Sequence, residues 1–390
     1  MRIVAKFGGT SLGNGRRVMR AARAVRDAVE EGHEVAVVAS AMGDTTDELL
    51  EEMEFDAGET DRDEILGMGE RTSIRMLNAA LHSLDVDSRF VEPGDPDWPV
   101  VIEDGDVDRE KTRRKAAELE EELEERVLVL PGFIGVEDGS VATLDRGGSD
   151  TTAVMLGNYM DADQTAIVTD VEGIMTGNPA VVDDAENLDS ITVEELRELS
   201  LRGAEVVAPA ALEYESEDLD VKVVHHQHGD LLRTGTAVEG RFESLIDMRE
   251  QPLACLTLAG RALKMREGIL SDLSTALADR GINIDSTSTG MDSVTFYVDE
   301  EASEEAKRAL HSVVVENDPL SSVTVEEGIA VLRVVTPELP SDVSELEDIL
   351  GHLGERGVEL HEIITSASSV ALFVDWSDRE EALEVLQENF

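Results

Sequence analysis

A lysine, two glycines and two hydroxyl side chains stand together near the start of the chain. The apolar residues 3–5 indicate a buried strand, and they lead directly into Lys6, Phe7, Gly8, Gly9, Thr10 and Ser11. Glycines let a polyanion approach backbone N–H groups closely, and the ammonium of Lys6 can follow a phosphate through its transfer. In the common P-loop the lysine follows the glycines instead of preceding them. The hexapeptide alone therefore predicts a phosphate-binding turn or, equally well, an ordinary strand-to-helix turn with a surface lysine.

Two more glycine loops follow apolar strands further along the chain. The first, residues 144–152, contains Arg146, whose planar guanidinium suits a carboxylate, and Asp150, which can orient a lysine or a metal ion. The second, residues 171–179, comes after a strand expected at 166–170. Three glycine-containing loops, each placed after an apolar strand, are a far more specific signal than any one of them.

The elements that carry these loops predict a parallel sheet covered by helices on both faces. An amphipathic helix at 14–31 precedes a continuous apolar strand at 34–39, and strands buried on both faces are typical of parallel sheets. Ligands of such sheets lie beyond the carboxyl ends of the strands, where Ser40, Thr45 and Thr46 stand.

One acidic side chain, Glu70, is expected near the start of a helix at 67–81. A carboxylate in that place can complement the helix dipole or bind the ammonium group of a ligand. The preceding residues 51–64 are acidic and irregular, and they predict a solvated loop.

Three histidines, His225, His226 and His228, follow a strand expected at 221–224. They suggest a metal site, but neighbouring residues of a strand point to opposite faces, and no further ligand cluster is evident. We therefore expect no metal site built by the protein alone.

The composition limits the class and the compartment of the protein. A length of 390 residues suggests two or three domains, each long enough for a real core. No hydrophobic run approaches the ~18 residues of a membrane span, and residues 1–30 lack the apolar core of a signal peptide. Cys255 is the only cysteine, so no intrachain disulfide is possible and a reducing cytoplasm is expected.

The charge balance is strongly acidic. The 33 basic and 86 acidic residues give a net charge of −53, which disfavours nucleic-acid and acidic-membrane partners. Only six of the 33 basic residues are lysines. An apolar content of 41% with clear periodicity argues against disorder. An acidic, lysine-poor surface on a patterned core resembles proteins from salt-accumulating cytoplasms, above all those of halophilic archaea.

From about residue 254 the pattern changes to two copies of a small α+β unit. Elements in the order βαββαβ are expected between 254 and 325. Residues 293–299 superpose without gaps on residues 369–375, at an offset of 76. The second copy stops before a final strand, so we expect it to complete its sheet with the first copy or with another subunit.

In order and spacing, five motifs resemble the aspartate kinases, and the duplicated C-terminal unit resembles their paired ACT domains. The resemblance covers essentially the whole chain. It implies an α/β fold with a parallel-rich sheet followed by two ACT-like units. The implied activity is phosphorylation of the side-chain carboxylate of L-aspartate by ATP with Mg²⁺, the entry step to lysine, threonine, methionine and isoleucine. The motifs are residues 6–11, 40–49, 68–71, 146–150 and 169–174.

The resemblance also implies roles for individual residues. Lys6 would hold the transferring phosphoryl group, and Asp150 would organise the catalytic lysines and the metal ion. Arg146 would bind the α-carboxylate of aspartate. The implied substrate set is Ser40, Thr45 or Thr46, Glu70, Arg146, Gly147, Gly148 and Ser149. The implied nucleotide set is Lys6, Phe7, Gly8, Gly9, Thr10, Thr169, Asp170, Met175, Gly177 and Asn178.

The chain departs from the aspartate kinase pattern at three positions. Met175 stands where the family usually has tyrosine, and Ala180 where it usually has the arginine of Asp-Pro-Arg. Glu205 replaces the family's second lysine, and a carboxylate cannot neutralise phosphate charge. Either Arg202 or Lys222 substitutes, nucleotide binding has shifted, or activity is weak. A catalytically dead amino-acid sensor and a kinase for another acidic amino acid therefore remain as alternatives.

The C-terminal pair is expected to be regulatory. Asp285 occupies a position that resembles the ACT effector segment, and it would bind the ammonium of lysine or threonine, while His361 takes its place in the second copy. We expect a homodimer or a higher oligomer. The expected segments are a catalytic domain at 1–235, a linker at 236–252, and ACT-like domains at 253–326 and 327–390.

The acidic composition predicts a dependence on salt. As potassium chloride falls from molar concentration toward ~0.1 M, the screening length grows from ~3 to ~10 Å and repulsion among the acidic groups increases. We expect the protein to unfold or to lose activity over this range. A melting temperature that does not respond to potassium chloride would contradict salt adaptation.

Overall fold

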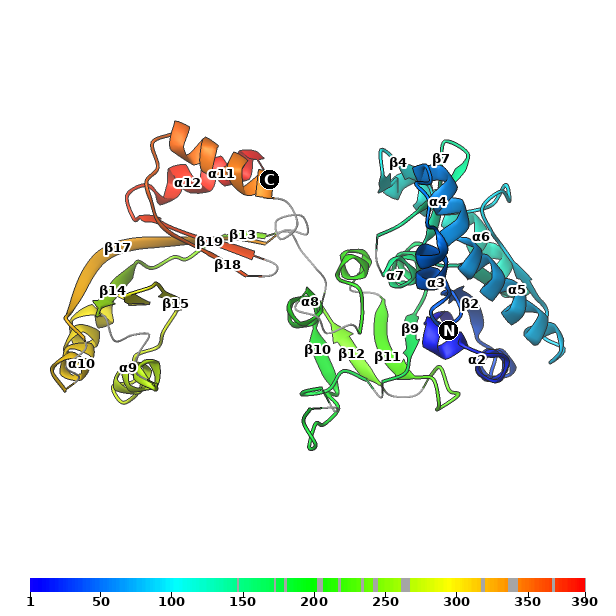
Figure 1. Cartoon of the computed structure of the whole chain (residues 1–390), viewed down its shortest axis with the longest axis horizontal. Helices are drawn as coiled ribbons and strands as arrows, with labels where there is room; N and C mark the ends of the chain where they lie inside the picture. The colour runs from blue at the N-terminus through cyan, green and yellow to red at the C-terminus, as the bar shows by residue number, and fades with distance from the viewer. Residues whose placement is uncertain are drawn as a thin grey trace. The chain divides into compact units, whose positions relative to one another are not determined.

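The chain divides into two compact units, Met1–Phe242 and Glu243–Phe390 (Figure 1). The computed structural model describes all residues except 146, 172, 179–180, 202–205, 217–218, 233–234, 241–244, 261–266, 317–319, 336–342, 367–368 and 390. Arg146, Ala180, Arg202 and Glu205 therefore lie outside the described residues. Within the described part of the chain, no helix has the length and hydrophobicity needed to cross a membrane.

The first unit is built on an eight-stranded sheet in the order β10-β12-β11-β9-β1-β2-β6-β3. Neighbouring strands run parallel except β11 and β12. This confirms the predicted parallel-rich α/β architecture. The strands are β1 Arg2–Phe7, β2 Glu34–Ala39, β3 Ser88–Phe90, β6 Val127–Pro131, β9 Gln164–Thr169, β10 Ser190–Thr192, β11 Asp220–His225 and β12 Thr236–Glu239.

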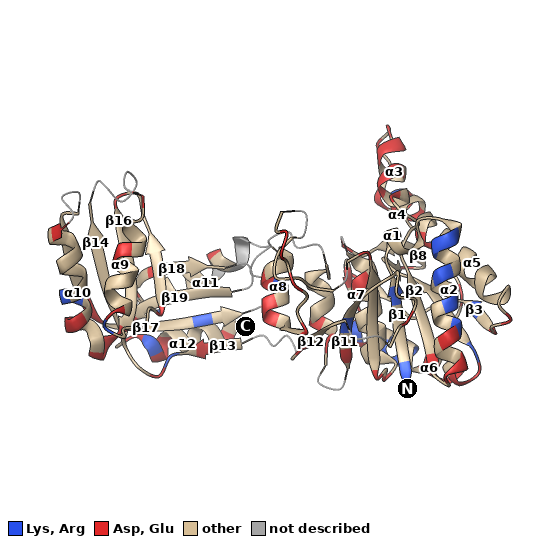
Figure 2. Ribbon diagram, turned by 90° about the horizontal axis from the view of Figure 1, so that it is seen from below, with Lys and Arg blue, Asp and Glu red and all other residues tan. Residues whose placement is uncertain are grey.

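Helices cover both faces of this sheet, because its central strands are apolar on both sides. On one face α2 (Gly15–Glu30) and α5 (Met68–His82) pack against residues such as Ala5 and Val37. On the other face α6 (Arg109–Glu120) and α7 (Gly148–Tyr159) enclose Val4 and Val38 together with α8 (Val193–Leu201) and the 3-10 helix η2 (Pro209–Tyr214). Figure 2 shows that the Asp and Glu residues lie mostly on helices such as α8 and on the connecting loops.

The strand register brings the predicted loops to one edge of the sheet. In β1, Lys6 lies opposite Val38 of β2 and Ile167 of β9. The turn after β1 is tied to the turn after β2, since the N–H of Gly43 donates to the carbonyl of Gly9 at 2.9 Å. A Cβ on Gly9 would lie 2.7 Å from the oxygen of Gly43, so only glycine fits where the two turns meet.

The acidic stretch 51–64 is not the solvated loop that its composition predicts. It contributes the end of α3 (Thr45–Glu52) and most of α4 (Glu59–Leu66). The helix α3 has no buried residues, so its sequence carries no apolar stripe from which a helix could be predicted. Two short hairpins and a short helix complete the unit: α1 (Gly9–Leu12), β4 (Ile102–Glu103) with β5 (Asp106–Val107), and β7 (Ile134–Glu137) with β8 (Ser140–Thr143).

The second unit is a seven-stranded antiparallel sheet in the order β15-β16-β14-β17-β19-β18, with β13 also paired to β17. Its strands are β13 Leu245–Met248, β14 Leu253–Ala259, β15 Ser286–Thr289, β16 Ser293–Asp299, β17 Ser322–Val335, β18 Leu360–Thr365 and β19 Ser369–Asp375. Its helices are α9 Ile269–Ala278, α10 Ser303–Glu316, α11 Val343–Glu355 and α12 Arg379–Asn389, with the 3-10 turn η3 at Glu300–Ala302.

The internal repeat is visible in these bounds, because β16 and β19 begin and end at residues that differ by the predicted offset. The missing last strand of the second copy is β13, which precedes the first copy and pairs antiparallel with the end of β17. Residues 236–252, predicted as a linker, thus contain β12 and β13. Both strands have only four residues, and such short strands give a weak pattern in the sequence.

Strand β17 runs through the predicted boundary at residue 326 and serves both copies. Its pairing with β14 shifts between Leu253 and Cys255, and the bulge contains Gly328 at a φ of +76°. Rings of Tyr297 on β16 and Phe373 on β19 stack at 4.0 Å although β14 and β17 lie between those strands in the sheet. The sheet therefore bends sharply and brings the helix-free faces of its two halves together.

Candidate active site

A cavity of about 530 Å³ lies at the carboxyl ends of β1 and β2 and the amino end of α7. It unites the first predicted loop with the second, as expected for ligands of a parallel sheet. The described residues that line it are Lys6, Ser40, Thr46, Asp47, Leu50, Arg62, Leu66, Glu70, Phe133, Thr143, Leu144, Asp145, Gly147, Gly148, Ser149 and Asp150.

An ion pair joins the two loops. The Nζ atom of Lys6 lies 2.6 Å from Oδ1 of Asp150, and both side chains are about nine-tenths buried. The other carboxylate oxygen of Asp150 accepts a hydrogen bond from the N–H of Ala208 at 3.2 Å. Asp150 thereby holds the ammonium of Lys6 at the end of β1, which is the orienting role that the sequence predicts.

The glycines of the second loop bring α7 close to the sheet. Gly147 caps α7 at a φ of +87°, and a Cβ there would lie 2.4 Å from the Cβ of Ala208. Opposite, a Cβ on Gly132 would lie 2.6 Å from the side chain of Ser149. The amino end of α7 therefore reaches the cavity, where the helix dipole favours an anion, although the N–H groups of Gly148 and Asp150 already donate to the carbonyls of Asp145 and Gly147.

Glu70 is the buried carboxylate of the cavity. Its side chain is only 3% exposed, and Oε1 accepts a hydrogen bond from the N–H of Ala41 at 3.2 Å. No described residue gives Oε2 a hydrogen bond. Burial raises the pKa of Glu70 to about 7, and the hydrogen bond from Ala41 opposes this shift. A carboxylate with an unused buried oxygen is suited to bind the ammonium group of a ligand.

The hydroxyl groups near β2 differ in their placement. Ser40 and Thr46 line the cavity, whereas the hydroxyl of Thr45 donates to the carbonyl of Met42. The structure thus favours Thr46 of the two predicted threonines. At the first loop, Phe7 is buried in the core on the α2 side, so its side chain is not available to a nucleotide. Thr10 of the same loop is exposed.

None of the described residues of the third predicted loop lines this cavity. Thr169 ends β9 and its hydroxyl donates to Asp170 at 3.3 Å. Beyond them, Met175 forms a bridge with Asn187, so the loop folds back on itself. The roles of Thr169, Asp170, Met175, Gly177 and Asn178 as nucleotide contacts remain predictions.

The strand register shows on which face of the sheet Lys222 lies. It lies opposite Ala166 of β9, and Ala166 lies opposite Ala5 of β1. Paired residues of adjacent strands share a face, so Lys222 points to the face opposite to that of Lys6. It is buried there, and burial lowers its pKa.

The three histidines lie together as a cluster of rings. The rings of His225 and His226 stack at 4.6 Å, and Nδ1 of His226 contacts the carbonyl oxygen of Thr169 at 3.0 Å. Nδ1 of His225 accepts a hydrogen bond from the N–H of Gln227. Among the residues that the structure describes, no three His, Cys, Asp or Glu side chains are grouped as metal ligands.

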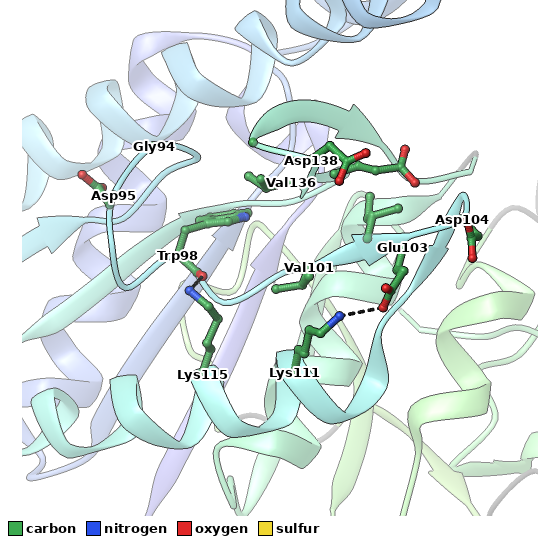
Figure 3. A pocket seen from close by; sticks show the side chains of 13 residues that line it. Gly94, Asp95, Trp98, Val101, Glu103, Asp104, Lys111, Lys115, Val136 and Asp138 are labelled. Atoms are coloured by element: carbon green, nitrogen blue, oxygen red, sulfur yellow. Dashed lines mark hydrogen bonds and ion pairs between the residues drawn. The ribbon is translucent and has the colours of Figure 1, made fainter.

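A second cavity of about 520 Å³ lies away from these residues, between α6 and the β4–β5 and β7–β8 hairpins (Figure 3). Lys111 and Lys115 point into it from α6. Lys111 is paired with Glu103 at 2.6 Å, and Lys115 donates to the carbonyl oxygens of Pro96 and Trp98. Both ammonium groups are therefore satisfied by the protein itself.

Comparison with protein families places this site in a known context. Residues 1–225 match the amino acid kinase family, and residues 256–314 match the ACT domain. The chain belongs to the amino acid kinase family.

Two relatives align with this chain along almost their whole length. The aspartokinase of Geobacillus stearothermophilus is 29% identical over 410 residues, covering 100% of this chain and 97% of the relative. Aspartokinase 2 of Bacillus subtilis is 28% identical over 405 residues, covering 100% and 97%. The chain therefore spans nearly the whole length of these relatives.

Two solved structures resemble the whole chain. The aspartate kinase from Synechocystis has a TM-score of 0.79 at 26% identity, covering 99% of this chain and 69% of that chain. Aspartokinase III of E. coli, solved in complex with aspartate and ADP, has a TM-score of 0.55 at 25% identity, covering 100% of both chains.

Sequence reasoning assigned no role to half of the described cavity lining. Arg62 lies within the stretch 51–64, which the sequence presents as irregular. Asp47, Leu50 and Leu66 flank that stretch on α3 and α4. Phe133 and Thr143 come from the β7–β8 hairpin and the turn before it, whereas Leu144 and Asp145 begin the predicted second glycine loop. Their position in that loop was the signal for the last two.

The raised pKa of Glu70 predicts how aspartate binding depends on pH. If ionised Glu70 binds the ammonium of the substrate, KM for aspartate rises as the pH falls below about 7. Glu70→Gln removes this dependence and raises KM above about pH 7, whereas at lower pH, where Glu70 is protonated, the KM values of the two proteins converge. Initial rates measured across the pH range provide the test, and an unchanged pH profile in the variant would contradict the assignment.

The same pKa gives a prediction about stability. Between pH 4.5 and about 7 the folded state binds more protons at Glu70 than the unfolded state, so its contribution to stability falls as pH rises. Glu70→Gln should therefore raise the melting temperature more at about pH 8 than at about pH 5. Thermal unfolding of both proteins at the two pH values checks the sign.

Proposed function

We propose that this chain is an aspartate kinase. It transfers the γ-phosphoryl group of ATP to the side-chain carboxylate of L-aspartate and releases 4-phospho-L-aspartate and ADP. The observation that carries the proposal is one cavity with two chemically distinct parts. Lys6, held by Asp150, meets the amino end of α7 in one part, and the buried carboxylate of Glu70 with its unused oxygen lies in the other. The relatives and solved structures named as aspartokinases support the same activity.

The residues of the cavity fit the steps of this reaction. The side-chain carboxylate of aspartate is ionised at neutral pH, so the nucleophile needs no general base. Phosphoryl transfer then depends on positioning the reactants in line and on neutralising the charge that moves between them. Glu70 holds the ammonium, Thr46 and Ser40 offer hydroxyl donors, and Lys6 accompanies the phosphoryl group. Arg146 is the proposed contact of the α-carboxylate.

The nucleotide is proposed to bind at the first and third loops. Gly8 and Gly9 allow its phosphates to approach the backbone, and Thr169, Asp170 and the loop that follows form its other side. Mg²⁺ commonly takes only one or two carboxylates from the protein and the remaining oxygens from phosphates and water. Asp150 is the carboxylate placed to share such an ion, which neutralises phosphate charge when it is bound.

The proposal predicts a preference for L-aspartate as the acceptor and a loss of rate when Lys6 is replaced. In high salt, ADP release measured by a coupled assay should occur with L-aspartate and not with glutamate or acetylglutamate. Lys6→Ala should lower the rate by about a hundredfold or more, because its charge acts mainly in the transition state. Turnover with glutamate instead would indicate a different acid kinase. Absence of turnover with all three acids would favour an amino-acid sensor of the same fold.

We further propose that the second unit binds lysine or threonine as a feedback effector. The ACT match at residues 256–314 supports this, and aspartokinase III of E. coli has also been solved in complex with lysine and aspartate. Asp285, the proposed contact, lies 3.6 Å from the guanidinium of Arg249, so an effector ammonium would compete with this arginine. In the second copy His361 contacts Asp375 at 3.1 Å. The two copies are therefore chemically different at this position.

The effector proposal is tested by calorimetric titration of the full chain with lysine, threonine and methionine. Lysine or threonine should bind, and Asp285→Ala should weaken this binding. If none binds at millimolar concentration, the second unit is better described as a dimerisation module. We also infer a cytoplasmic homodimer or higher oligomer adapted to high salt, and the salt titration described above tests the last point.

A further inference from the structure

We propose that Arg62 binds a carboxylate of the amino-acid substrate and is a specificity-determining residue of the site. The inference rests on the proposed function, because it assigns a contact for the acidic acceptor of that reaction. Arg62 lies on α4, in the stretch whose sequence suggested only a solvated loop, and it lines the cavity that contains Lys6 and Glu70.

The position of Arg62 is determined by its neighbours on α4. Asp63 accepts hydrogen bonds from the N–H and the hydroxyl of Thr143, both at 3.0 Å. Thr143 itself lines the cavity, and so does Leu66, which is buried one turn after Arg62. The helix is therefore attached to the wall of the cavity in the turn that follows Arg62. An arginine held in this way loses less conformational freedom on binding than one on a mobile segment.

Arg62 makes no ion pair with the described residues, although the chain has far more acidic than basic side chains. The next two arginines behave differently. Arg71 pairs with Glu92 at 2.8 Å and with Glu64 at 3.3 Å, and Arg75 also pairs with Glu92. The guanidinium of Arg62 is thus exposed, unpaired and adjacent to a cavity that must hold anions.

Most charged side chains among the described residues of the cavity are carboxylates, so the guanidinium of Arg62 matters for binding an anion. Asp47, Glu70 and Asp145 contribute carboxylates, while the ammonium of Lys6 is already paired with Asp150. Arg62 is the one cation of the described lining without a carboxylate partner. An acidic amino acid carries two carboxylates and one ammonium, so its net charge is negative at neutral pH. In a strongly acidic protein, a local positive charge is needed to attract it.

The residues around Arg62 favour the amino-acid acceptor, and not the nucleotide, as the ligand that Arg62 binds. Thr46 and Glu70, which are the proposed acceptor contacts, line the same cavity, and the proposed nucleotide residues at 169–178 do not. A guanidinium can also form two parallel hydrogen bonds with a carboxylate, which an ammonium cannot. With Arg146 assigned to the α-carboxylate, a dicarboxylate substrate still offers a second anionic group.

The experiment compares three variants of the full chain under the salt conditions in which the wild type is active. Arg62→Ala should raise KM for L-aspartate by about tenfold, the usual effect of losing a charge-assisted hydrogen bond, and leave KM for ATP unchanged. Arg62→Lys should lie between this variant and the wild type. Arg114→Ala is the matched control, because it removes one exposed, unpaired arginine from α6, outside the cavity. Its kinetics should equal those of the wild type.

Calorimetric titration with L-aspartate in the absence of nucleotide should show the same relative loss of affinity. Equal KM values for aspartate in the Arg62→Ala and Arg114→Ala variants would overturn the proposal. So would a fall in kcat at unchanged KM, which would place Arg62 on the transferring phosphoryl group. If the wild type itself shows no turnover with aspartate, it is the proposed function that fails.

Discussion

The ion pair between Lys6 and Asp150 is the contact on which the site depends. It joins the end of the first strand to the start of α7, far along the chain, and both charges are largely removed from water. Removing one partner would leave the other charge buried without compensation, which is costly. The pair forms because β1 lies between β2 and β9 and because Gly132 and Gly147 let α7 approach the sheet closely.

The strongly acidic composition makes the distribution of positive charge a functional question. A protein with a net charge of −53 must still bind a nucleotide polyphosphate and an anionic amino acid. Glu205 stands where aspartate kinases usually have their second lysine, and Lys222 lies on the face of the sheet opposite to Lys6. The described cations that line the cavity are Lys6 and Arg62. We propose that the first accompanies the phosphoryl group and that the second binds the amino-acid acceptor.

The second unit achieves its stability by sharing strands between its two copies. The single strand β17 belongs to both, β13 completes the second copy from a position before the first, and Tyr297 stacks on Phe373 across the bend. The hydroxyl of Tyr297 also donates to Glu362 at 2.7 Å, which links the two halves again. A ligand that changes one half therefore acts on strands that the other half uses, which is the physical requirement for linkage between them.

The amino-acid sequence by itself determined the parallel sheet, the glycine loops and the internal repeat, while the proposed roles of Lys6, Asp150 and Glu70 came from the resemblance to aspartate kinases. The first three follow from local patterns, because apolar runs, glycines after strands and a constant offset can all be read within short windows. Only the tertiary structure decided that Thr46 and not Thr45 faces the cavity, that β13 completes the second copy, and that Arg62 borders the site. Each of these depends on strand register or on packing between distant segments, which no local window of sequence contains.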